Sequence, residues 1–76
     1  MTLHFSKIEE LQPQRWMCKI APNDYIKRRV RVKLGDILID VGFRGKVSGI
    51  KLDEIIIDAI EGRPGEGRTY TVEGRR

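Results

Sequence analysis

The sequence has few of the residues that build catalytic or metal sites. Its 76 residues include one cysteine, Cys18, and one histidine, His4. A single cysteine excludes an intramolecular disulfide and a cysteine-based zinc site, and one histidine argues against a structural transition-metal site. Ser6 and Ser48 have no evident candidate base. Cys18 shares the parity of the apolar Trp16 and Ile20, which is typical of a buried, inert thiol. We therefore expect no catalytic residues, no metal and no cofactor.

Long apolar runs are also missing. No segment is long enough to span a bilayer, and the first residues do not combine a charged stretch with an apolar one as a signal peptide does. We expect a soluble cytoplasmic protein. A chain of this length buries only about 60–65% of its unfolded surface, which suits a small binding module better than an enzyme with a deep pocket.

The charged residues are unevenly distributed. Fifteen Lys and Arg residues exceed eleven Asp and Glu residues, giving a net charge of +4 that favours anionic partners. The acids concentrate at Glu9, Glu10 and between residues 53 and 61. The bases concentrate between residues 27 and 33, with others at Arg44, Lys46, Arg63, Arg68, Arg75 and Arg76. This pattern predicts a polarised surface.

The segment FSKIEELQP, residues 5–13, predicts a short N-terminal helix. Ser6 and Glu9 have the spacing of a capping box, and Pro13 ends the run. Ile8 and Leu11 would share one face of this helix. Because fewer than two turns are unstable alone, we expect residues 1–13 to form a helical arm that packs on the rest of the domain.

The rest of the chain has mainly strand patterns. Residues 15–20 alternate apolar and polar side chains, residues 22–24 are typical of a turn, and residues 25–34 predict a long strand that breaks or bends at Gly35-Asp36. Residues 37–50 combine alternating aliphatics with Gly42, Gly45 and Gly49. Interior glycines mark bulges and bends, which curl short sheets into small barrels. Residues 69–73 predict a closing strand.

Residues 53–61 allow two interpretations. Three consecutive isoleucines favour a strand, because β-branched side chains lose rotamer freedom in a helix. Asp53 and Gly62, however, lie where a helix would have its caps, and the apolar residues between them also fit a helical spacing. We therefore expect an all-β fold, a small curled β-barrel of SH3-like or OB-like type, which becomes α+β if this segment is helical. Residues 1–76 would form one domain, and residues 62–68, rich in glycine and charge, a flexible loop.

The stretch IKRRVRVKL, residues 26–34, alternates cations with aliphatic residues, and only Arg28 departs from the alternation. On a strand, such cations lie about 6.5–7 Å apart along one face, a spacing comparable to that of nucleic-acid phosphates. The alternative is that they only protect a sheet edge from aggregation. Arg28 distinguishes the two interpretations: it either pairs with Asp40, Asp53 or Glu54, or joins the solvent-facing cations.

Exposed aromatic rings beside these cations would favour single-stranded nucleic acid, which stacks its bases on such rings. Tyr25 begins the basic stretch, and Phe43 and Arg44 stand between two glycines that would let a tight bend turn both side chains outward. The alternative for this hairpin is a purely structural bend, and Trp16 is expected in the core. The candidate nucleic-acid-binding residues are Tyr25, Lys27, Arg28, Arg29, Arg31, Lys33, Phe43, Arg44, Lys46, Arg63 and Arg68.

Several segments resemble known families of small barrels. VKLGDILI, GFRGKVSGI, DEIIID and RTYTVE follow one another in an order similar to that of SH3-like barrels, including the KOW-type modules. VRVKL, FRGKVSGI and IIIDAIE resemble the Sm-like barrels, and RRVRVKLGDILI resembles the S1-like OB barrels. These resemblances imply a curled sheet that binds RNA or a nucleoprotein assembly.

We therefore expect a non-catalytic nucleic-acid-binding module that prefers RNA or single strands to duplex DNA. The alternative is a small protein-binding regulator or adaptor, phage-encoded or a subunit of a larger assembly, that docks through a strand edge and its acidic-aliphatic segment. Exposed strand edges would also allow homo-oligomers.

Overall fold

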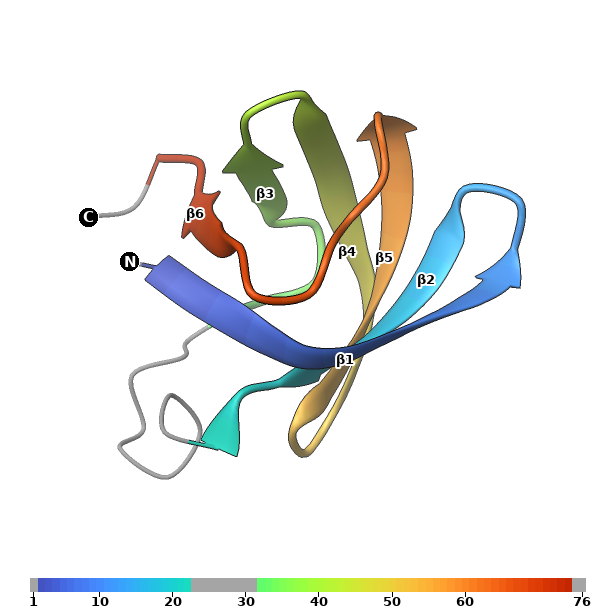
Figure 1. Ribbon diagram of the computed structural model, residues 1–76, viewed down its shortest axis with the longest axis vertical. Coiled ribbons are helices and arrows are strands. Elements are labelled where there is room, and N and C mark those ends of the chain that lie inside the picture. The colour runs from blue at the N-terminus through green and yellow to red at the C-terminus, as the bar shows by residue number, and fades with distance from the viewer. Residues whose placement is uncertain (1, 23–31, 75–76) are drawn as a thin grey trace.

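The computed structural model describes residues 2–22 and 32–74, which form a closed antiparallel β-barrel (Figure 1). Its strands are β1 (Thr2–Gln12), β2 (Arg15–Ile20), β3 (Ile37–Asp40), β4 (Phe43–Lys51), β5 (Glu54–Glu61) and β6 (Thr69–Val72). They are arranged in the order β1-β2-β5-β4-β3-β6, and β6 closes the barrel by pairing with β1. The all-β prediction is confirmed, and residues 54–61 are a strand.

The predicted N-terminal helix is wrong, because residues 2–12 form β1. This strand pairs with β2 from Phe5 to Gln12 and with β6 from Thr2 to His4. Leu3 and Phe5 are buried between exposed or half-buried neighbours, a strand alternation that lies just before the capping-box signal. A helix of fewer than two turns is marginal by itself, so pairing on two sides outweighs the local helical preference.

The core consists of side chains that point inward from all six of these strands. Trp16, Cys18 and Ile20 of β2 are buried, as the alternation of residues 15–20 predicts, and Tyr70 and Val72 of β6 point into the same core. Among the described residues, no polar or charged residue is buried in this core. The buried residues are Leu3, Phe5, Trp16, Cys18, Ile20, Leu38, Phe43, Val47, Ile55, Ile57, Tyr70 and Val72.

Two glycines of β4 allow the sheet to curl. The pairing of β4 with β5 shifts register beside Gly45 and again before Gly49, as predicted for strands bent at glycines. At Gly45 the requirement is steric, because a Cβ there would lie 2.5 Å from Cγ2 of Ile57 and 2.6 Å from Cζ of Phe43. The missing side chain therefore makes room for the Phe43 ring inside the barrel.

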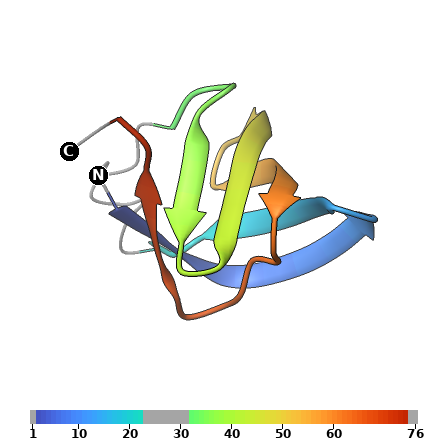
Figure 2. The same cartoon turned by 90° about the horizontal axis from the view of Figure 1, so that it is seen from above.

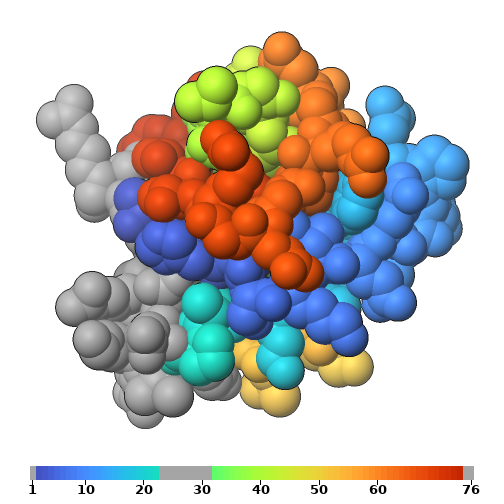
Figure 3. All heavy atoms as spheres, in the orientation of Figure 1, coloured from blue at the N-terminus to red at the C-terminus, as the bar shows by residue number. Residues whose placement is uncertain are grey.

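Two parts of the barrel shape its surface: the β1–β2 hairpin and the loop of residues 62–68. The β1–β2 hairpin extends away from the end where the two termini lie (Figure 1). A second view places β3 and β4 across the barrel from β1 and β2 (Figure 2). Residues 62–68, which connect β5 with β6, cover the face between β1 and the β3–β4 turn (Figure 3).

Candidate nucleic-acid interface

Most of the basic stretch falls outside the described residues. Tyr25, Lys27, Arg28, Arg29 and Arg31 are not described. The two alternatives for Arg28, an acidic partner or exposure to solvent, therefore lie outside the described residues as well. The last part of the predicted strand is wrong, since residues 32–34 are not in a strand. They lead instead into a turn at Gly35, whose φ of 89° is in the left-handed region that favours glycine.

This turn attaches the end of the basic stretch to β4. The backbone N–H of Lys33 donates to Oδ2 of Asp36 at 2.8 Å. Gly35 N–H donates to the Val47 carbonyl at 2.8 Å, and Val47 N–H donates to the Asp36 carbonyl at 2.9 Å. Lys33 is exposed beside these bonds, and Lys46, next to Val47, is exposed on the outer face of β4. The hydrogen bonds thus tie the turn that begins at Lys33 to the part of β4 that carries Lys46.

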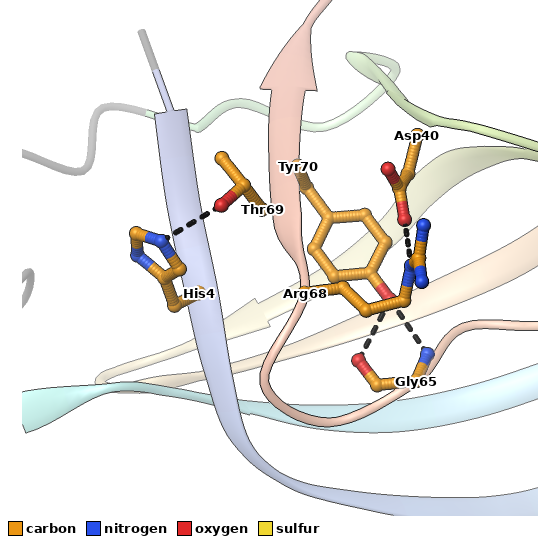
Figure 4. Close-up of polar contacts among 6 residues, drawn as sticks. All are labelled: His4, Asp40, Gly65, Arg68, Thr69 and Tyr70. Carbon is orange, nitrogen blue, oxygen red and sulfur yellow. Dashed lines mark hydrogen bonds and ion pairs between the residues drawn. The ribbon is translucent and has the colours of Figure 1, made fainter.

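Arg44 and Arg68 are both engaged by carboxylates. Nη2 of Arg44 donates to both carboxylate oxygens of Glu73, at 3.2 and 3.3 Å. Nε of Arg68 pairs with Oδ2 of Asp40 (Figure 4). The hydrogen bond from Arg68 lowers the pKa of Asp40, so the carboxylate stays ionised. Both guanidinium groups lie at the surface, but each already has an anionic partner.

The prediction that Phe43 is exposed is wrong. Its side chain is 4% exposed and meets the Tyr70 ring edge-on, with 5.5 Å between ring centroids. The reason is the alternation of β4, in which Phe43, Gly45 and Val47 point inward, and the space that Gly45 leaves for the ring. All aromatic residues of the described ranges are buried, so none of them offers an exposed face for base stacking.

Arg63 lies over Trp16. The guanidinium carbon is 5.3 Å from the centroid of the Trp16 ring, a cation–π contact that joins the 62–68 loop to the β1–β2 hairpin. A shallow groove of about 340 Å³ runs beside this pair and includes Glu10, Gln14 and Gly62 in its lining. Sequence reasoning missed this contact, because nothing in the local pattern relates two positions on different elements.

The 62–68 loop is held at a second point by Tyr70. The Tyr70 hydroxyl accepts a hydrogen bond from Gly65 N–H at 2.6 Å and donates one to the Gly65 carbonyl at 2.8 Å (Figure 4). Burial of the hydroxyl raises the pKa of Tyr70, which keeps it protonated as a donor. Nearby, Nε2 of His4 lies 3.1 Å from Oγ1 of Thr69. These contacts explain how a glycine-rich loop has a defined path over the barrel.

The barrel surface is close to electrically neutral. Residues 2–22 and 32–74 contain nine Lys and Arg residues and ten Asp and Glu residues. Further cations in this set are paired, Arg15 with Asp58 at 2.8 Å and Lys19 with Asp53 at 3.9 Å. The excess positive charge of the chain is therefore contributed by Lys27, Arg28, Arg29 and Arg31, together with Arg75 and Arg76.

The described residues contain no group of three potential metal ligands, and none of their helices is long and apolar enough to cross a membrane. Cys18 is completely buried, and desolvation raises the pKa of its thiol to about 12, so it is protonated at neutral pH. Comparison of the chain with protein-family models, with curated proteins and with solved structures finds no match.

Proposed function

We propose that this protein is a non-catalytic, cytoplasmic nucleic-acid-binding module whose target is RNA. One observation carries the proposal: the described residues are nearly neutral in net charge, whereas the sequence concentrates cations at residues 27–31. Nine basic and ten acidic residues share the described barrel, whereas residues 27–31 contain four cations in five positions. Such a concentration of cations suits a polyanion, whose phosphates release counterions when they are neutralised.

The barrel then serves as the support of this cationic stretch. The turn at residues 33–36 attaches its end to β4, on which Lys46 is exposed, so that phosphate contacts could continue from the stretch onto the barrel. Arg44 and Arg68, which are engaged by Glu73 and Asp40, contribute less, because a phosphate would have to compete with a carboxylate already in place.

Recognition in this proposal rests mainly on phosphates rather than on bases. Phe43, Trp16 and Tyr70 are buried, which leaves Tyr25 as the remaining candidate for base stacking. Binding should therefore depend weakly on sequence. The choice of RNA rather than duplex DNA is supported by the resemblance to SH3-like KOW-type, Sm-like and S1-like barrels, small curled folds that bind RNA or nucleoprotein assemblies.

The direct test compares two matched charge reversals. Arg29→Glu changes the cationic stretch, and Lys51→Glu changes an exposed cation of β4 by the same amount of charge. With a fluorescent single-stranded RNA at low salt, we expect Arg29→Glu to weaken binding by roughly tenfold. Lys51→Glu should change binding little, because Arg29 would contact phosphates and Lys51 would not.

Equal losses in both variants would mean that net charge, and not the cationic stretch, drives binding. Tighter binding to a DNA duplex than to the RNA would contradict the choice of RNA. No binding of the wild type to either ligand at low salt would contradict the proposal and favour the alternative, a protein-binding adaptor.

A further inference from the structure

The second edge of β1 pairs with no described strand over most of the length of β1, although the 62–68 loop lies on the neighbouring face (Figure 3). β1 spans Thr2–Gln12, but its pairing with β6 ends at His4. From Phe5 to Gln12 the strand pairs with β2 on one side only, and no other described strand lies along its second edge. Figure 1 shows β1 continuing past β6 toward the β1–β2 turn. An unpaired edge of this length presents backbone donors and acceptors that another strand can use.

Two side chains on this edge, those of Lys7 and Glu9, are charged and have no ionic partner in the part of the chain that the structure describes. Lys7 and Glu9 are exposed on the outer face of β1, with Ile8 between them pointing to the opposite face. Across the β1–β2 ladder, Lys7 is opposite Lys19 and Glu9 is opposite Met17. Among the described residues, neither Lys7 nor Glu9 forms an ion pair. Two cations directly opposite each other are unfavourable, so Lys7 would gain from a carboxylate on its free side.

We propose that the open edge of β1 pairs with the same edge of a second copy of this chain. Two identical strands can pair antiparallel about a two-fold axis at Ile8, so that Ile8 of one copy lies opposite Ile8 of the other. In this register Lys7 of each copy lies opposite Glu9 of the other copy. All four charges are then on the outer face of one continuous sheet, since side chains two positions apart share a face.

The charges of Lys7 and Glu9 distinguish this dimer from the alternative in which charged residues only keep the edge of β1 from pairing with other chains. Charged residues and bulges often keep an edge strand monomeric, and β1 has register shifts beside Ser6 and Leu11. The segment between these shifts is regular, however, and its charges are self-complementary. Two like charges at these positions would repel a second copy. Lys7 and Glu9 instead form two attractive pairs with the second copy, one on each side of Ile8.

The test uses reversal of each charge and then mixing of the variants. Lys7→Glu places two carboxylates opposite each other at both symmetric positions, and Glu9→Lys places two cations there. We expect wild type to form a dimer in sedimentation velocity, and each single reversal to weaken dimerisation by about tenfold or more. An equimolar mixture of Lys7→Glu and Glu9→Lys should restore dimers, because each variant then supplies the charge that the other lacks.

Two controls keep the result specific. Lys51→Glu changes the net charge as much as Lys7→Glu but lies on β4, so its dimerisation should equal that of wild type. Circular dichroism of every variant checks that the barrel remains folded. A wild type that stays monomeric at the highest soluble concentration overturns the proposal. So does a mixture that stays monomeric, or a pair of single reversals that dimerise as wild type does.

Discussion

At the scale of single residues, Leu52 has an unfavourable backbone conformation. It occupies the β4–β5 turn with a φ of 45°, and its side chain is 79% exposed. Tight hairpins that need a positive φ usually have glycine or asparagine there, because a bulky side chain meets the neighbouring carbonyl. The exposed leucine therefore costs conformational energy without burying apolar surface in exchange.

Replacing this leucine should stabilise the barrel. We expect Leu52→Gly to raise the free energy of unfolding by about 0.5–1 kcal/mol, measured by urea denaturation, because relief of strain exceeds the added chain entropy. Val41→Gly is the matched control, since Val41 is another exposed turn residue but lacks a positive φ, and it should lower stability. A comparable loss in both variants would contradict the strain at Leu52.

At the scale of elements, the sequence predicted strands best where alternation is the only local signal. The alternation of residues 15–20 predicts β2, and that of residues 69–73 predicts β6, which ends one residue earlier, at Val72. For β1, a capping box competed with alternation, and the outcome depended on pairing with β2 and β6, which no local pattern reveals. The ambiguity of β5 was resolved in the same way, because this strand lies between β2 and β4 and pairs with both.

The candidate site was less predictable than the fold. A glycine two positions away decided that Phe43 points inward, an effect that depends on Ile57 across the sheet. The carboxylates that engage Arg44 and Arg68 belong to Glu73 and Asp40, on other parts of the barrel. Charge and type of these residues could be read from the sequence, but their partners are set by the closure of the sheet.

The 62–68 loop provides a pH-dependent test at this scale. The hydrogen bond from Arg68 lowers the pKa of Asp40 in the folded protein. A carboxyl whose pKa is lower in the folded state stabilises the protein above its unfolded pKa of about 4, and this contribution is lost as pH falls through the folded value. The ion pair should therefore stabilise the loop at pH 7 and not in strong acid.

We expect Asp40→Asn to reduce the free energy of unfolding at pH 7, with a difference from wild type that shrinks as pH falls below about 4. Denaturation at a series of pH values measures this difference. Glu66→Gln serves as control, because Glu66 is an exposed residue of the same loop without an ion pair among the described residues. A constant difference for Asp40→Asn across this range would show that the ion pair does not contribute.

At the scale of the whole molecule, the main feature is the uneven distribution of charge along the chain. The barrel has a compact core and balanced surface charge, while the net charge of +4 comes from stretches outside the described residues. A protein of this kind would bind nucleic acid through a small number of phosphate contacts, and its affinity would follow the salt concentration accordingly. The proposed binding is therefore electrostatic.

The most direct measurement is the salt dependence of RNA binding by the wild-type protein. If Lys27, Arg28, Arg29 and Arg31 neutralise about four phosphates, a plot of the logarithm of the association constant against the logarithm of salt concentration should have a slope of about −3. A slope near zero, or no detectable binding at low salt, would contradict the account.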